Sequence, residues 1–212
     1  AKIVDKRRLA VLVSGRGSNM QRIIDACKEG RINAEVVVVI SDKEHAFALA
    51  RAEKEGITSF CLDPSQFATK QEYEEKFAQA ISEYAVDYLL LAGFMRVLSP
   101  VFIGGVKVPI LNIHPSLLPA FTGLHAQRQA LEYGVRFSGC TVHFVDQGVD
   151  TGPIILQAVV PVYPDDTEES LSQRILQEEH QLYPQVVQLL CEGRIRCEGR
   201  KVIITKEGQK VE

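Results

Sequence analysis

The chain has 212 residues, of which 46% are hydrophobic and 24% charged, and its formal net charge is −3. This balance is typical of a globular protein that is large enough to bury a substantial core. The weak negative charge provides no general attraction to nucleic acid or to an anionic membrane, so we expect neither as a partner.

Five cysteines are scattered along the chain, and no two of them form a Cys-x-x-Cys pair. Their odd number and spacing argue against a disulfide framework or a zinc module and favour a reduced, cytoplasmic protein. The N-terminal stretch is charged and lacks the apolar segment of a signal peptide. We therefore expect a cytoplasmic location, while the oligomeric state stays open.

In the first half, short apolar runs alternate with amphipathic stretches. This alternation predicts an open, mostly parallel α/β sheet with helices on both faces. The predicted strands cover residues 9–13, 36–40, 58–62, 87–91 and 109–113. The predicted helices, in which apolar residues recur at helical spacing, cover residues 18–28, 45–55 and 69–84.

The second half has a different pattern, which predicts antiparallel additions to the sheet. A short helix over residues 124–133 is followed by strands over 140–145 and 153–160, joined by a loop rich in glycine and aspartate. A long helix follows over 167–191, with Asp166 and Glu169 at capping-box spacing. We predict a single domain over 1–212, with a core of about 9–191 and a possible short hairpin within the tail 192–212.

The most informative segment lies at the end of the fifth predicted strand. Asn112 and His114 are two residues apart, so on a strand their side chains point to the same side, and Pro115 then ends the strand. A carboxamide beside an imidazole suits a site where a carbonyl oxygen gains negative charge. The alternative is a polar strand end closed by a turn.

A glycine-rich turn, Ser14-Gly15-Arg16-Gly17-Ser18-Asn19, joins the first predicted strand to the first helix. Backbone N–H groups at a helix start can bind phosphate, and such crevices at strand ends hold ligands in open α/β sheets. The sequence is neither Gly-x-Gly-x-x-Gly nor a P-loop. The alternative is an ordinary turn with Ser18 as the N-cap and Gln21 as its capping-box partner.

Two further strand-end loops are candidates. Asp150, in the loop 146–153, could reach His114 and hold it in its cationic form, or could cap a solvated turn. The loop 93–98 is unusually apolar and could line a slot for a flat aromatic ligand, or could be ordinary core packing. A carboxylate of Glu178-Glu179-His180, on the last helix, could bind sugar hydroxyls, although such a segment is usually a solvated helix face.

The histidines do not suggest a metal site. His114, His125 and His143 lack the spacing of known zinc motifs, and no Gly-x-Ser-x-Gly segment is present. We expect no metal and interpret His125 and His143 as hydrogen-bonded histidines.

Taken in order, these segments resemble the phosphoribosylglycinamide formyltransferase family, the folate-dependent transformylases of purine synthesis. The matching stretches lie between Leu9 and Cys191 and include S-G-R-G-S-N, A-G-F-M-R-V-L-S-P, L-N-I-H-P-S-L-L-P, V-D-T-G-P-I-I-L-Q and Q-E-E-H-Q-L-Y-P. The resemblance implies a Rossmann-like formyltransferase fold. It also implies transfer of the formyl group of 10-formyltetrahydrofolate, a co-substrate, to the amine of glycinamide ribonucleotide.

The resemblance implies residue roles as well. The catalytic residues would be Asn112, His114 and Asp150. The ribonucleotide phosphate and ribose would bind Gly17, Ser18, Asn19, Leu176, Gln177, Glu178 and Glu179. The folate would bind Lys70, Met95, Arg96, Val97, Leu98, Asn112, Asp146, Gln147, Gly148, Val149 and Asp150. Lys70 stands where the family often has arginine, and the peptide bond between Leu118 and Pro119 would be cis.

Three alternatives share parts of this pattern. A methionyl-tRNA formyltransferase would need a further nucleic-acid-binding domain, which we do not expect here. A formyltetrahydrofolate hydrolase would use water as the acceptor, and a non-catalytic folate or nucleotide sensor would bind without turnover. The phosphate loop and Glu179 favour a sugar-phosphate acceptor.

Overall fold

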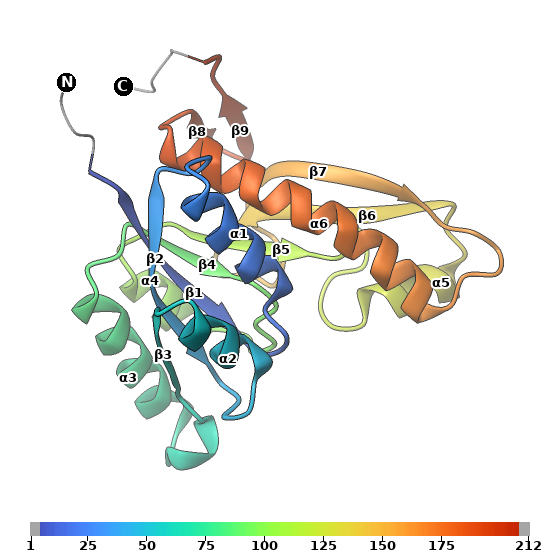
Figure 1. Cartoon of the computed structure of the whole chain (residues 1–212). Coiled ribbons are helices and arrows are strands. Elements are labelled where there is room, and N and C mark those ends of the chain that lie inside the picture. Colours follow the sequence, from blue (N-terminus) through green and yellow to red (C-terminus); the bar gives the residue numbers. More distant parts are fainter. Residues whose placement is uncertain (1–4, 208–212) are drawn as a thin grey trace. The chain divides into compact units, whose positions relative to one another are not determined.

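The computed structural model describes residues 5–207 (Figure 1). The chain divides into two compact units, of which the first ends at Leu111 and the second begins at Asn112. The division falls inside strand β5 (Ile110–His114). The prediction of a single domain stays a prediction, and each unit is described by itself.

The first unit is built on parallel strands. Its strands are β1 (Arg7–Val13), β2 (Ala34–Ser41), β3 (Thr58–Cys61), β4 (Tyr88–Leu91) and the start of β5, in the spatial order β3-β2-β1-β4-β5. β1 pairs in parallel with both β2 and β4, and β2 pairs in parallel with β3. The apolar run Leu9–Leu12 is fully buried, as expected for a parallel strand covered on both faces.

Helices connect these strands and cover the sheet. They are α1 (Ser18–Lys28), α2 (Phe47–Lys54), α3 (Lys70–Glu83) and α4 (Pro100–Gly105), with a 3-10 turn η1 (Pro64–Gln66). The strand order runs one way from β1 to β3 and then reverses to β4. Because parallel crossovers are right-handed, α1 and α2 lie on one face and α3 on the other. Contacts between α1 and α2, and between α3 and α4, agree with this.

The second unit adds antiparallel strands, as predicted. The spatial order is β5-β6-β7, and β6 (Phe137–Phe144) pairs antiparallel with β7 (Ile154–Pro161). The long helix α6 (Glu168–Cys191) packs against both strands and also contacts α5 (Ala126–Tyr133) (Figure 1). β8 (Ile195–Glu198) and β9 (Lys201–Ile204) form an antiparallel hairpin within the tail.

Element types agree closely with the predicted ones, so the open, mostly parallel α/β class is confirmed. The short helices η1 and α4 are additional. Ser99 caps α4 and Pro100 starts it, which is a helix-start signal. With only six residues, however, α4 is too short to show a helical repeat of apolar residues.

Two helix caps differ from those considered. The N-cap of α1 is Gly17, in the left-handed conformation, so Ser18 is already the first helical residue and is not the N-cap. The capping box of α6 joins Thr167 and Ser170 rather than Asp166 and Glu169. Asp166 instead accepts hydrogen bonds from both terminal nitrogens of Arg174, because its carboxylate matches the guanidinium fork.

Among residues 5–207, none of the helices has the length and apolar character needed to span a membrane.

Candidate active site

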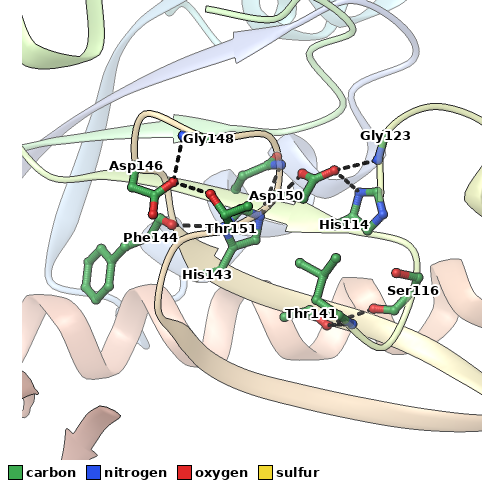
Figure 2. A network of polar contacts seen from close by, with 12 residues as sticks. His114, Ser116, Gly123, Thr141, His143, Phe144, Asp146, Gly148, Asp150 and Thr151 are labelled. Atoms are coloured by element: carbon green, nitrogen blue, oxygen red, sulfur yellow. Dashed lines mark hydrogen bonds and ion pairs between the residues drawn. The ribbon is translucent and has the colours of Figure 1, made fainter. Parts of the chain in front are cut away.

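The end of β5 carries the first two site residues. Asn112 and His114 alternate with the buried residues Leu111 and Ile113, so both point to the other side of the strand. His114 is buried, whereas Asn112 is half-buried. His114 contacts Asp150, which belongs to the loop between β6 and β7 (Figure 2). Asn112 contacts His143, and His143 in turn lies beside Asp150. The second unit therefore brings together the three residues predicted to be catalytic.

His114 lies between two oxygen atoms that can only accept hydrogen bonds. Its Nε2 is 2.7 Å from the carbonyl oxygen of Phe121, and its Nδ1 is 3.4 Å from Oδ2 of Asp150. A neutral imidazole has one N–H group and could satisfy only one of them. Both ring nitrogens of His114 thus face acceptors, one of which is a carboxylate oxygen.

Asp150 is held in an uncommon conformation. Its φ angle is 54°, in the left-handed region, which aspartate enters more often than most non-glycine residues do. Its Oδ2 accepts a hydrogen bond of 2.8 Å from the backbone N–H of Gly123. The same oxygen faces His114, so one oxygen of the carboxylate receives both contacts (Figure 2).

A second imidazole, His143 on β6, lies on the other side of Asp150. Its Nδ1 is 2.9 Å from the carbonyl oxygen of Phe144 and must donate to it. Burial is the largest influence on His143 and lowers its pKa, which the contact with Phe144 and the charge of Asp150 only partly offset. His143 is therefore neutral near pH 7. Its Nε2 lies 3.8 Å from Oδ1 of Asp150, but the two side chains do not form an ion pair because the ring carries no charge.

The neutral His143 orients the side-chain amide of Asn112 through a hydrogen bond. With the proton on Nδ1, Nε2 carries a lone pair, and the Nδ2 amide nitrogen of Asn112 lies 3.5 Å away. This long hydrogen bond directs one amide N–H toward His143. The interpretation of His143 as a hydrogen-bonded histidine is confirmed, whereas His125 is exposed, and its side chain makes no cap hydrogen bond.

The loop between β6 and β7 is organised by Asp146. Its Oδ1 accepts hydrogen bonds from the backbone N–H of Gly148 and the hydroxyl of Thr151, at 3.0 and 2.5 Å (Figure 2). Burial raises the pKa of Asp146, but these two bonds outweigh it, and the net pKa is lowered. At Gly152 an added Cβ would overlap the carbonyl oxygen of Phe144, so only glycine fits there. The predicted residues Gln147, Gly148 and Val149 form the exposed tip.

The turn after β5 contains a cis peptide bond between Leu118 and Pro119, as predicted. The buried hydroxyl of Thr141, on β6, donates to the carbonyl of Ser116 and accepts from the backbone N–H of Leu118, at 2.7 and 3.1 Å. The turn is thereby tied to β6 (Figure 2). This fixes where the chain enters the segment that contacts His114.

In the first unit, the predicted folate residues border one cavity. Lys70, Met95, Arg96, Val97 and Leu98 line a space of about 540 Å³, together with the aromatic residues Phe67 and Tyr73. A cavity of this size and partly aromatic lining can hold a flat ring. Lys70 donates through Nζ to the carbonyl of Val97 at 3.1 Å.

Asp42, which the sequence analysis did not single out, also borders this cavity. Its side chain is only 1% exposed, and Oδ2 accepts from Nε of Arg96 at 3.1 Å. The position directly after β2 is the only sequence signal for it, because carboxyl ends of strands commonly line ligand sites.

The two predicted sets of ribonucleotide residues lie in different units. In the first unit, Gly17 has φ of 75°, and an added Cβ would overlap Ala48, so a larger residue would displace α2. Ser18 and Asn19 form the first turn of α1, which has no acidic residue. In the second unit, Leu176, Gln177, Glu178 and Glu179 lie on α6, where Glu179 is buried.

Within residues 5–207, no group of acidic, histidine and cysteine side chains could hold a metal ion.

The site thus pairs a strand-end carboxamide and imidazole with a loop carboxylate on an α/β fold. A family model described as formyl transferase matches residues 7–187. This is most of the chain, and the chain therefore belongs to the formyl transferase family.

Three individual proteins show which members of the family the chain resembles. The chain is 46% identical over 188 residues to phosphoribosylglycinamide formyltransferase of Escherichia coli, covering 89% of each protein. It is 49% identical over 190 residues to the trifunctional purine biosynthetic protein adenosine-3 of Drosophila melanogaster, covering 89% of this chain but only 14% of that protein. It matches glycinamide ribonucleotide transformylase 1 of Symbiobacterium toebii with a TM-score of 0.92 and 50% identity, covering 95% of both chains.

Proposed function

We propose that the protein transfers the formyl group of 10-formyltetrahydrofolate to the amine of 5-phosphoribosylglycinamide in purine biosynthesis. The products are formylglycinamide ribonucleotide and tetrahydrofolate. The observation that carries the proposal is the contact between His114 and Asp150 beside Asn112. The names of the E. coli and Symbiobacterium toebii relatives support the substrates.

The proposed reaction is an acyl transfer without a covalent enzyme intermediate. The amine nitrogen attacks the formyl carbon, a new C–N bond forms, and the formyl oxygen becomes an oxyanion. Asn112 and the His114 imidazolium stabilise this oxyanion by hydrogen bonding and charge. The bond from carbon to N10 of the folate then breaks, and the proton lost by the amine ends on N10.

Asp150 acts in this proposal as the counter-charge of His114. Only 6% of the His114 side chain and 11% of the Asp150 side chain are exposed. Low exposure limits screening by water, so the attraction is stronger than in a surface pair. Asp150 therefore places a buried negative charge beside His114 while the oxyanion forms.

Binding of the two substrates is assigned to the remaining predicted residues. The start of α1, at Gly17, Ser18 and Asn19, binds the phosphate, because a helix N-terminus without acidic residues attracts anions. Glu179 and its neighbours Leu176, Gln177 and Glu178 bind the ribose. We assign folate binding to Lys70 and residues 95–98, which line the cavity of the first unit, and to Asn112 and residues 146–150 of the second unit.

The location and the other partners complete the proposal. All five cysteines are free thiols, which supports a cytoplasmic location. The substrates are small molecules, and the mechanism uses no metal.

A turnover assay with and without glycinamide ribonucleotide tests the function. Tetrahydrofolate release that depends on the ribonucleotide, together with formation of the formylated product, supports the transferase. Release without the ribonucleotide supports a hydrolase. Binding of both ligands without release supports a sensor, and either of these results contradicts the proposal.

A further inference from the structure

A single short loop contacts both members of the His114–Asp150 pair through its main chain. The carbonyl of Phe121 accepts from Nε2 of His114 at 2.7 Å. Two residues later, the N–H of Gly123 donates to Oδ2 of Asp150 at 2.8 Å (Figure 2). The orientation of both side chains therefore depends on where the backbone of residues 121–123 lies.

This backbone has an unfavourable conformation. Phe121, Gly123 and His125 have φ angles of 54°, 76° and 58°. Only glycine adopts this left-handed region readily, so two of these three residues are strained. A strained loop keeps its shape only when surrounding contacts hold it.

Gln129, on α5, provides such contacts. Its Nε2 donates to the carbonyl of Thr122 at 3.0 Å and to the carbonyl of Leu124 at 2.9 Å. These carbonyls stand on either side of Gly123. Gln129 is the fourth residue of α5, and helical side chains point toward the helix N-terminus, which brings its amide back over the preceding loop.

We propose that Gln129 is a positioning residue that sets the His114–Asp150 pair through the loop 121–125. One amide nitrogen uses both of its protons on this loop, so it fixes two carbonyls at once. The residue touches neither reacting group and acts through Phe121 and Gly123. The inference rests on the proposed formyl transfer for its kinetic consequence but not for its structural one.

Three substitutions of Gln129 separate hydrogen bonding from size. Gln129→Glu keeps the shape, removes both donors and places a negative charge against two carbonyls. Gln129→Met keeps the length without polarity. Gln129→Lys keeps donors on a different side chain. The matched control is Gln127→Glu on the same helix, because the side chain of Gln127 makes no hydrogen bond within residues 5–207.

We expect kcat of Gln129→Glu to fall about 30-fold, because misplacement of catalytic groups by 1 Å costs roughly 10²-fold. For Gln129→Met, kcat should fall about fivefold, and for Gln129→Lys about twofold. KM of both substrates should stay within about twofold, since Asp150 is the one assigned binding residue that this loop contacts among residues 5–207. The control Gln127→Glu should match the parent protein. Equal losses in all three Gln129 variants, or losses in KM alone, would overturn the proposal.

Amide hydrogen exchange gives a readout that does not need turnover. In Gln129→Glu, exchange in residues 121–125 should rise at least about tenfold, while exchange in β6 and the melting temperature stay near those of the parent. Unchanged exchange in this segment overturns the inference even if the proposed function holds. If the parent protein lacks transferase activity but exchange responds as expected, the proposed function fails and the role of Gln129 in the loop stands.

Discussion

Two loops that the sequence assigns to folate binding are held in different ways. Residues 93–99 of the first unit are bound along their length by side chains from other segments, namely those of Ser14, Asp42, Lys70 and Glu74. In the loop 146–152 of the second unit, neither Gln147 nor Val149 makes a hydrogen bond within residues 5–207. This loop is held by Asp146 within itself and by the contacts of Asp150 and Thr151.

The difference indicates a division of work. The first loop is preformed, so changes around it should alter ligand binding and stability more than turnover. The second loop depends on a few contacts next to Asp150, so changes there should act on the chemical step.

The largest effect is expected for Asp150→Asn, which keeps the shape and removes the counter-charge of His114. We expect kcat to fall about 10³-fold, between the roughly 10²-fold of a lost oxyanion donor and the roughly 10⁴-fold of a lost triad aspartate. Steady-state kinetics measures this loss, with the exposed Asp165→Asn as control. A kcat close to that of the parent protein would remove Asp150 from this role.

Asn112→Ala should follow, with a loss of about 10²–10³ in kcat, since a single oxyanion donor is removed. Single-turnover formation of the formylated product measures the chemical step directly. Asn33→Ala, an exposed position in the first unit, serves as control. A defect that appears only in KM would show that Asn112 binds a substrate without stabilising the oxyanion.

Arg96→Met tests whether the first loop, residues 93–99, is preformed. It leaves the buried carboxylate of Asp42 without its cation, and loss of one hydrogen-bond partner of a buried group costs about 1–3 kcal/mol. We expect a lower melting temperature and a folate KM raised about tenfold, with kcat changed less than about twofold. The double variant with Asp42→Asn should recover part of the stability. A large loss of kcat would contradict the division between the loops.

Arg200→Ala should have a smaller effect on turnover. Arg200, in the turn between β8 and β9, donates through Nη2 to the carbonyl of Thr151 at 2.9 Å, directly after Asp150. Because the guanidinium is exposed, we expect kcat to fall only about two- to fivefold. Arg196→Ala in the same hairpin is the control, since Arg196 pairs with Glu198. Equal activity of both variants would show that the hairpin does not order the loop.

The smallest effect concerns stability and pH. Burial lowers the pKa of His143 in the folded protein below its ordinary value of 6.5. Between the folded-state pKa and 6.5, the unfolded chain binds more protons than the folded protein does. The contribution of His143 to the free energy of unfolding is therefore present above pH 6.5 and is lost as pH falls below it. Urea unfolding from pH 8 to pH 5 should show a weaker pH dependence in His143→Gln than in the parent. Equal slopes would contradict a neutral, buried His143.

Sequence patterns predicted the fold to a large extent. The alternation of valine-rich runs with amphipathic stretches follows from the two side-chain periods of strands and helices, and α1 (Ser18–Lys28) lies at the predicted residues. The caps were harder to predict. Thr167 and Ser170 form the box of α6, while the equally suitable Asp166 pairs with Arg174. A competing partner within the fold decides such a case, and the local sequence does not contain it.

Within the candidate site, residue type and order determined which side chains could take part. Asn112 and His114 share one side of a strand because the side-chain period is two, and Asp150 follows in a loop rich in glycine and aspartate. Tertiary structure alone decided their orientation and their hydrogen-bond partners. Both nitrogens of His114 face acceptors, whereas burial keeps His143 neutral, and no sequence pattern distinguishes two imidazoles by their surroundings. The main-chain groups of Phe121 and Gly123 were equally invisible, because every residue carries the same backbone and only its path through space gives a carbonyl or an N–H a partner.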